Sequence, residues 1–476
     1  MDAEDVDLLR EYLRRHPELS RHLRIDPPVV EWKGRWRRVQ SYRLLATGIA
    51  LCLPDGASVR LIASRIAAGR RVGYRQSLIQ MLQTHKPHWK IVRIAQGTDR
   101  LRHQSAAILR ILLRRGRYYQ AALIAYPGES AELSNRILTA AVLWWDHLSR
   151  LHTGNIDHGR SFRPRASGLR PFLSKAIICL PESWSELILR NFPRLDLPLE
   201  CYKYRLGEAP SGQSALWRIY PGPVGSSQIQ SPYVMFPYQR YIPELLQGIR
   251  EQYPDLDLIY RRKRWEVAYA GLCVAWYDEE RRQCFYDVKR PKRLLASSFR
   301  KLGEHVQRVK LLRSFPPPDA RHPYYRLHQE QWLESLLIKD HRMLNPEFAS
   351  TIYCQVPTCL DEERKILDLL TVTSEGRLAV LELKVEKNLD LIFQGLDYWE
   401  RVDHHLKQRD FQQAGYFEGF TLSQESPLLY LICPLFDFHR VTPVLDRYLQ
   451  RQVAIYCVGI NTNWKNGIKV LRRFML

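Results

Sequence analysis

Residues 366–384 read Ile-Leu-Asp-Leu-Leu-Thr-Val-Thr-Ser-Glu-Gly-Arg-Leu-Ala-Val-Leu-Glu-Leu-Lys. Two apolar runs flank the short segment Ser374-Glu375-Gly376, which predicts two β-strands joined by a three-residue turn. Turns of this kind favour glycine in the left-handed backbone position, and Gly376 stands there. The turn therefore pairs Thr373 with Arg377 and fixes the register of both strands.

That register places three charged side chains on one face of the hairpin. Counting back from the turn sets Asp368 opposite Glu382, and Lys384, two residues further on, points to the same side. Two carboxylates and an ammonium on an otherwise apolar hairpin are costly unless something binds there, and a divalent cation is the natural partner. A two-residue turn would instead send Asp368 to the other face. A surface hairpin with an ion pair contributing under about 1 kcal/mol is the simpler alternative.

Three motifs in this part of the chain resemble those of a known family. Asp368 followed by Glu382-Leu383-Lys384 is similar to the signature of the PD-(D/E)XK nuclease superfamily, most closely its RecB-like and NucS-like branches. A predicted amphipathic helix upstream supplies Glu334, which matches the acidic residue of the family's first core helix. Downstream, Gln394-Gly395-Leu396-Asp397-Tyr398 matches the Gln-x-x-x-Tyr motif of the RecB-like branch. The resemblance covers roughly residues 325–460.

The resemblance implies a catalytic set of Asp368, Glu382 and Lys384. Carboxylate oxygens suit Mg²⁺ or Mn²⁺, and such an ion would bind the scissile phosphate and acidify a water molecule. Lys384 would orient the attacking water or neutralise developing charge. One departure from the family pattern is Leu367, which stands where a proline often precedes the first acidic residue.

The resemblance also assigns supporting residues. Glu334 would hold a metal ion or a metal-bound water, with Glu330, one helical turn earlier, as a possible substitute. Gln394 and Tyr398 lie four residues apart, so they share one face of a helix beside the site and would position the phosphate backbone. An ordinary helix surface is the alternative for this last pair.

The charge distribution predicts a nucleic-acid partner. The chain of 476 residues carries 72 Lys and Arg against 50 Asp and Glu, a formal net charge of +22. Residues 321–476 hold 19 basic and 20 acidic residues, so residues 1–320 carry the whole excess, 53 against 30. This asymmetry favours a basic region that binds a polyanion and a neutral region that cuts it. No long basic helix with a broad apolar face is evident, which disfavours a membrane partner.

Two basic runs interleave cations with aromatic rings, as proteins that bind single strands often do. The candidate nucleic-acid-binding residues are Arg114, Arg115, Arg117, Arg261, Arg262, Lys263 and Arg264. A solvated basic face beside a strand edge is the alternative for each run. Residues 58–69 and 74–82 are also compatible with a helix-turn-helix.

Composition predicts three domains. The Pro-rich segment 314–323 is typical of a stiff linker, and a stretch rich in Gly, Ser, Arg and Pro begins at Thr153. We therefore expect a basic α+β domain over residues 1–160, a middle α+β domain over 161–313 and a nuclease-like domain over 324–476. The last domain should be of the α/β class, with a restriction-endonuclease-like mixed sheet flanked by helices.

Periodicity predicts the local structure of several segments. In the N-terminal region we expect helices over 104–115 and 131–149 and a strand over 121–126. After the 366–384 hairpin we expect a helix over 390–407 and a strand over 428–433.

Other function classes lack their signatures. There is no phosphate-binding loop of the ATPase kind, and the nine cysteines include no Cys-x-x-Cys pair. Scattered cysteines are typical of reduced core residues. No apolar segment approaches 18 residues and the first residues are acidic, which favours a cytoplasmic protein without a signal peptide.

These observations predict a cytoplasmic, Mg²⁺-dependent (or Mn²⁺-dependent) nuclease that acts on DNA, with substrate bound by the basic N-terminal region. The alternative is a non-catalytic nucleic-acid-binding or interaction protein of a defence or mobile-element complex, whose nuclease fold is idle or needs a partner. A homodimer would suit a symmetric double cut, but no sequence feature indicates one.

Overall fold

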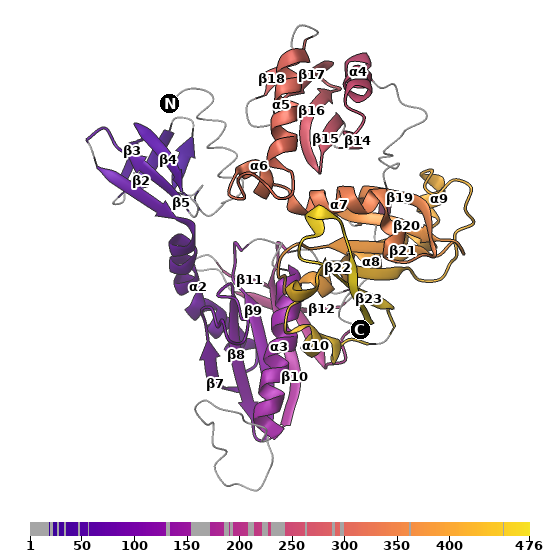
Figure 1. The fold of residues 1–476 in the computed structure, drawn as a ribbon. Coiled ribbons are helices and arrows are strands. Elements are labelled where there is room, and N and C mark those ends of the chain that lie inside the picture. The colour runs from indigo at the N-terminus through magenta and orange to yellow at the C-terminus, as the bar shows by residue number, and fades with distance from the viewer. Residues whose placement is uncertain are drawn as a thin grey trace. The chain divides into compact units, whose positions relative to one another are not determined.

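The computed structural model describes residues 19, 22–25, 28–32, 35–45, 48–55, 57–129, 134–153, 172–184, 190, 194–207, 214–220, 227–229, 243–261, 264–287, 291–295, 299–360, 363–450 and 452–476. The chain is mixed α/β and divides into two compact units (Figure 1), which comprise Met1–Trp184 with Leu197–Tyr220 and Ser185–Asp196 with Pro221–Leu476. Within the described residues, no helix is long and apolar enough to cross a membrane. All nine cysteines are free thiols, as expected.

The first unit begins with two small antiparallel sheets. One consists of β1 (Leu23–Ile25), β2 (Pro28–Trp32) and β3 (Arg35–Arg38), and the other of β4 (Ser41–Leu45), β5 (Gly48–Cys52) and β6 (Ser58–Ile62). Leu23, Val30, Ile49 and Leu51 belong to one shared core. The continuous helix α2 (Ala63–His85) follows β6, so the predicted helix-turn-helix is wrong: residues 58–62 form a strand and no turn interrupts the helix.

A six-stranded sheet forms the body of the first unit, in the order β12-β11-β10-β9-β8-β7. Its strands are β7 (Lys90–Ala95), β8 (Ile108–Arg115), β9 (Tyr118–Ala125), β10 (Phe172–Pro181), β11 (Leu199–Arg205) and β12 (Ala215–Ile219). The inner strands β9, β10 and β11 are parallel, and helix α3 (Ser134–Thr153) lies between β9 and β10 in the chain. This is a βαβ arrangement, the usual way to connect parallel neighbours.

The predicted helix over residues 104–115 is wrong, because residues 108–115 form β8. Residues 108–113 are buried in a sheet that α2 contacts through Leu82 on one face and α3 through Trp144 on the other. A strand covered on both faces needs apolar side chains at nearly every position, so it loses the alternation that marks a strand. The predicted strand over 121–126 and helix over 131–149 correspond to β9 and α3.

The predicted domain boundary at residue 160 does not separate two domains. The boundary itself falls within 154–171, outside the described residues, but β10 beyond it pairs with β9 in one sheet. The Gly-, Ser-, Arg- and Pro-rich composition of this stretch therefore belongs to a connection within the first unit.

The second unit contains a five-stranded antiparallel sheet in the middle of the chain. Its strands are β14 (Asp257–Arg261), β15 (Arg264–Tyr269), β16 (Leu272–Asp278), β17 (Gln283–Tyr286) and β18 (Lys292–Arg293). Helices α4 (Glu244–Gln252) and α5 (Phe299–Leu312) contribute Leu246, Ile249, Leu302 and Val306 to its core.

The predicted linker over 314–323 follows a buried anchor. Arg313 donates hydrogen bonds to the carbonyl oxygens of Ala270 (2.6 Å), Tyr324 (2.6 Å) and Leu327 (2.8 Å). Its side chain also stacks on Trp332 at 4.4 Å. The middle sheet is thereby joined to the start of the C-terminal region.

A seven-stranded mixed sheet forms the C-terminal region, in the order β13-β19-β20-β21-β22-β23-β24. The strands are β13 (Ser227–Ile229), β19 (Phe348–Leu360), β20 (Glu363–Thr373), β21 (Leu378–Leu383), β22 (Leu428–Pro434), β23 (Ile455–Ile460) and β24 (Val470–Met475). The helices are α6 (Pro323–Arg326), α7 (Gln329–Lys339), α8 (Leu391–Lys407), α9 (Asp410–Gln413) and α10 (Thr442–Asp446), with short 3₁₀ turns at His341–Met343, Leu435–Asp437 and Trp464–Asn466. The predicted helix over 390–407 and strand over 428–433 correspond to α8 and β22.

Helices α7 and α8 pack against opposite faces of this sheet. Leu333 of α7 shares a core with Leu381 and Leu383, whereas Gly395 of α8 contacts Leu431. Because side chains alternate along a strand, Glu382 lies on the α8 face, between the two leucines that face α7. Figure 1 shows both helices beside the β19–β23 strands.

Candidate active site

The β20–β21 hairpin has the predicted register. Thr373 donates its backbone N–H to the carbonyl of Arg377 (2.8 Å), and Gly376 adopts φ +85°. A side chain at residue 376 would also collide with the Thr421 carbonyl. The turn therefore requires glycine both for its positive φ and for lack of space. The turn therefore sets the position of every side chain on both strands.

Asp368 and Glu382 are direct neighbours across the two strands. The ladder pairs Leu369 with Leu381, and the next position places Asp368 opposite Glu382. Asp368 Oδ2 accepts a hydrogen bond from the backbone N–H of Leu383 (3.0 Å). Glu382 is fully buried, whereas Asp368 is half-buried at the open end of the strand pair.

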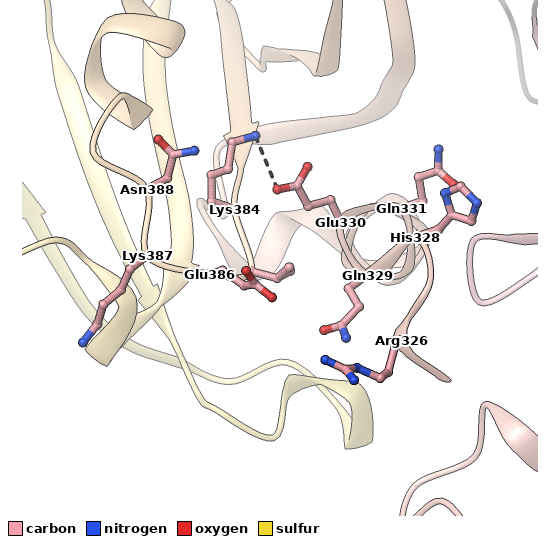
Figure 2. A pocket seen from close by; sticks show the side chains of 10 residues that line it. Arg326, His328, Gln329, Glu330, Gln331, Lys384, Glu386, Lys387 and Asn388 are labelled. Carbon is pink, nitrogen blue, oxygen red and sulfur yellow. Dashed lines mark ion pairs between the residues drawn. The ribbon is translucent and has the colours of Figure 1, made fainter. Parts of the chain in front are cut away.

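Lys384 completes the cluster at the end of β21. Its Nζ lies 3.1 Å from Glu382 Oε1 and 3.5 Å from Glu330 Oε1, and it donates to the Leu383 carbonyl at 3.0 Å. Figure 2 shows the pairing of Lys384 with Glu330, which reaches in from the first turn of α7. One buried ammonium is thus shared by two carboxylates.

The electrostatics of the cluster are unbalanced. Burial and the charge of Asp368 raise the pKa of Glu382 well above its usual value, although Lys384 opposes this. Burial also raises the pKa values of Asp368 and Glu330. Burial alone would lower the pKa of Lys384, but Glu382, Asp368 and Glu330 together raise it. Three carboxyl groups around one ammonium are therefore short of positive charge.

The donor set fits a hard divalent cation. Among the described residues, the Lys384 ammonium at 3.1 Å from Oε1 is the partner of the buried Glu382 carboxylate, and Oε2 has no hydrogen-bond donor. In the described part of the chain, no three His, Cys, Asp or Glu side chains converge as a complete metal site. Mg²⁺ commonly binds through one or two carboxylates and takes its other ligands from water and substrate phosphate. Asp368 and Glu382 offer that arrangement.

Of the two glutamates on α7, the structure brings Glu330 to Lys384. Glu334 is buried one turn further along, where its Oε2 accepts a hydrogen bond from Gln355 Nε2 at 2.6 Å. Strand β19 pairs with β20 on both sides of Gln355, which places this residue beside Asp368. Glu334 is therefore joined to β19 from the α7 side of the sheet, and its role as a metal ligand stays a prediction.

Sequence reasoning missed Gln355. It interrupts the ladder of β19 with a left-handed backbone, φ +52°, which is uncommon for a residue with a side chain. The available signal was a lone polar residue within a run of apolar ones.

Gln394 and Tyr398 lie on α8 beside the cluster. Gln394 Nε2 is 3.4 Å from the Tyr398 hydroxyl. Burial raises the pKa of Tyr398, and the charges of Glu382 and Asp368 raise it further. The helix comes this close because Gly395 faces the sheet, where a Cβ would lie 2.6 Å from Leu431 Cδ2. The structure therefore brings both predicted positioning residues to the site.

A pocket of about 400 Å³ opens onto the cluster between the start of α7 and the loop after β21. It is lined by Arg326, residues 328–331 and residues 384–388. Arg326 and Lys387 are exposed at its rim, and Lys384 and Glu330 form its inner wall (Figure 2). The pocket therefore exposes the Lys384–Glu330 ion pair to solvent between cationic side chains.

The predicted nucleic-acid-binding residues lie elsewhere. Arg114, Arg115 and Arg117 are exposed at the β8–β9 turn of the first unit. Arg264 pairs with the buried Glu266 at 2.6 Å, so its guanidinium already has a partner within the middle sheet. Arg262 and Lys263, and the side chain of Arg261, lie outside the described residues.

Comparison with known proteins gives little further information. No protein-family model matches the chain, and no curated protein matches its sequence. Among solved structures, the chain is similar to Can2 from Sulfobacillus thermosulfidooxidans, determined in complex with cyclic tetra-adenylate (cA4). The identity is 10%, the match covers 58% of this chain and 86% of that chain, and the TM-score is 0.17. A similarity this low supports no inference about fold or function.

Proposed function

We propose that the C-terminal region is a divalent-cation-dependent nuclease of the PD-(D/E)XK type that hydrolyses phosphodiester bonds, with DNA as its substrate. The observation that carries this proposal is the fully buried Glu382 opposite Asp368, for which the described residues supply one partner, the Lys384 ammonium. One ammonium shared with Glu330 compensates this buried charge incompletely, so a further cation would stabilise it. An accessible pocket is lined by Lys384 and Glu330, the ion pair that adjoins Glu382.

In this proposal, the three charged residues of the hairpin have different roles. Asp368 and Glu382 would hold the cation, which when bound supplies positive charge to the scissile phosphate and acidifies water. Lys384 has a raised pKa, so it stays protonated at neutral pH and acts as a cation rather than as a general base. Its ammonium would stabilise the charge that develops on the phosphate oxygens.

Residues on the two helices would orient the substrate. Tyr398 stays protonated because its pKa is raised, so its hydroxyl is available as a hydrogen-bond donor. Gln394 lies beside it and adds an amide donor. At the pocket rim, Arg326 and Lys387 would contact phosphates that flank the scissile bond.

The charge asymmetry supports a nucleic-acid substrate. Residues 1–320 carry 53 basic against 30 acidic residues, while residues 321–476 are nearly neutral. A basic region can hold the polyanion by releasing its counterions, so the catalytic region needs little affinity of its own. The first part of the chain would thus bring the strand to the site.

Cleavage of labelled nucleic acids by the full-length protein tests this proposal. Single-stranded, duplex and branched DNA and RNA are incubated with Mg²⁺, with Mn²⁺ or with EDTA. We expect cation-dependent cutting, at background level in Asp368→Asn and about 100-fold slower or more in Lys384→Met. The matched controls are Glu425→Gln and Lys407→Met, exposed groups of the same region whose loss should leave the rate unchanged.

Two outcomes would contradict the proposal. Cutting that survives in both site variants would place the active centre elsewhere. Salt-sensitive binding without cutting of any of these nucleic acids would favour the non-catalytic alternative, a nucleic-acid-binding protein with an idle or partner-dependent site.

A further inference from the structure

Two aromatic rings are exposed together at one end of the six-stranded sheet. Tyr118 is the first residue of β9 and is 42% exposed, and Phe172 is the first residue of β10 and is 56% exposed. Their ring centroids are 5.9 Å apart in an edge-to-face arrangement. Large apolar rings at the surface leave favourable burial energy unused, so a paired exposure of this kind suggests a binding surface.

Arginines lie next to these rings on the same surface. The register pairs Tyr118 with Arg115 on one side and with Phe172 on the other, so the three side chains form one row across the sheet. Arg117, in the turn between β8 and β9, places its guanidinium 5.2 Å from the Tyr118 ring centre and donates to the Tyr118 hydroxyl at 3.2 Å.

Described carboxylates do not neutralise the positive charge of this sheet end. Lys90 pairs with Arg114 across β7 and β8, and these two cations lie at the same sheet end but on the face opposite Arg115 and the rings. Among the described residues, no carboxylate lies within ion-pair distance of Lys90, Arg114, Arg115 or Arg117. Asp99, the one acidic residue of this stretch, pairs with Arg102 instead. Residues 60–120 contain 14 Lys and Arg and only one acidic residue.

The positive surface continues along the same face of the sheet. Lys175 pairs in register with Gln120, two residues after Tyr118, and therefore lies on the same side as the rings. It contacts the buried Glu200 at 2.5 Å, and Arg218 and Lys86 approach that carboxylate at 3.3 Å and 3.8 Å. Three cations around one carboxylate leave this cluster with an excess of positive charge.

We propose that the surface formed by Tyr118, Phe172, Arg115 and Arg117 binds single-stranded nucleic acid. Bases would stack on the two rings, and the arginines would contact the adjoining phosphates. Every base has a stackable face, but a duplex hides these faces inside its own stack, so the surface should prefer single strands. The unpaired cations favour a polyanion over a protein partner. This inference concerns binding in the first unit and does not depend on cleavage by the second.

Binding of the full-length protein in EDTA, where no divalent cation is available, tests the inference. Fluorescence anisotropy is measured with labelled single-stranded DNA, single-stranded RNA and duplex DNA. We expect Tyr118→Ala and Phe172→Ala each to weaken single-strand binding by about 5-fold to 100-fold, the range typical of a lost base stack. Phe172→Trp should retain binding, because it keeps a stacking ring.

The salt dependence of binding distinguishes the contribution of the aromatic rings from that of the arginines. Arg115→Gln and Arg117→Gln should each reduce the slope of log Kd against log salt by about one, whereas the ring variants should leave the slope unchanged. Phe436→Ala is the matched control, because Phe436 is a 72% exposed aromatic residue of the second unit. The melting temperature of each variant checks that the first unit remains folded.

The inference is overturned if both ring variants bind as tightly as the unchanged protein. It is also overturned if they weaken duplex and single-strand binding equally, which would indicate charge alone. If the unchanged protein binds single strands in this way but cuts no nucleic acid, the result counts against the proposed nuclease and not against this surface. The DNA and RNA arms identify which single strand is preferred.

Discussion

Glu382 and Glu200 are both buried glutamates on inner strands of mixed sheets, but their surroundings differ. Glu200 is contacted by Lys175, Arg218 and Lys86. Burial alone would raise the pKa of Glu200, but Lys175 and its other partners lower it overall. Among the described residues, Glu382 forms an ion pair only with the ammonium of Lys384, and its pKa is raised. The first carboxylate is over-compensated and the second is under-compensated.

The comparison separates a structural ion cluster from a site prepared for a ligand. A buried charge with several partners stabilises the fold once it is ionised. A buried charge that lacks partners lowers stability, and such groups persist mainly where function needs them. On this reasoning, Glu382 fits the proposed active site, where stability would be lost for function, and Glu200 fits a structural ion cluster.

The largest expected effect is an opposite response to one substitution at the two positions. Glu382→Gln should abolish cleavage and raise the free energy of unfolding by about 0.5–2 kcal/mol, because it removes the repulsion with Asp368. Glu200→Gln should keep cleavage and lower that free energy by about 1–3 kcal/mol, because three cations lose their counterion. Cleavage assays measure the first effect. Hydrogen exchange of the β21 and β11 peptides measures the change in stability at each glutamate. A loss of stability in both variants would remove the distinction.

The sequence predicts the register of the β20–β21 hairpin because a short turn determines it. The glycine at residue 376 admits one turn geometry, and the strand register then aligns Asp368 with Glu382 without any long-range information. The sequence does not determine which glutamate of α7 contacts Lys384. Glu330 and Glu334 are one turn apart on the same face of α7, and only the position of the helix end shows that Glu330 reaches Lys384.

The sequence predicts the first unit less well because its contacts are distant in the chain. The pairing of Tyr118 with Phe172 joins residues separated by 54 positions, and no local pattern indicates it. Strand β8 has apolar side chains at successive positions, which a helical pattern fits equally well. The basic run with aromatic rings at residues 114–119 predicted a binding site there, but only the sheet register brings Phe172 to it.

Addition of a divalent cation should stabilise only the Glu382 region. Binding to the folded state at 100 times the dissociation constant adds about 2.7 kcal/mol to the free energy of unfolding. We expect Mg²⁺ or Mn²⁺ to raise the melting temperature of the second unit relative to EDTA in the unchanged protein and in Glu200→Gln. The shift should be absent in Glu382→Gln. An equal shift in all three proteins would indicate cation binding at another place.

The pH dependence of stability should have opposite signs at the two glutamates. In EDTA, the raised pKa of Glu382 makes its contribution most favourable below the unfolded pKa, near 4.5, and this contribution is lost as pH rises through the raised value. The lowered pKa of Glu200 contributes stability above 4.5, and this is lost as pH falls through the lowered value. Each unit of pKa shift is equivalent to about 1.4 kcal/mol. Unfolding of each Gln variant beside the unchanged protein from acid to neutral pH measures both trends.

The smallest expected effect comes from removing one cation from each cluster. Lys175→Met leaves Glu200 with Arg218 and Lys86, and because Lys175 is itself partly exposed, we expect a loss below about 1 kcal/mol. Lys384→Met leaves Glu382 without a cation, and we expect a loss of about 1–3 kcal/mol, limited because Glu382 then stays protonated. Urea unfolding in EDTA measures both.

The ratio of these two losses matters more than either value. If Glu200 is over-compensated, its cations are partly redundant, and removing the first costs little. If Glu382 depends on one ammonium, no other group replaces it until a divalent cation binds, so Mg²⁺ should restore part of the stability lost in Lys384→Met and none of that lost in Lys175→Met. Equal losses in EDTA, both insensitive to Mg²⁺, would mean that the two glutamates are equivalent structural charges and that the difference in their surroundings has no bearing on function.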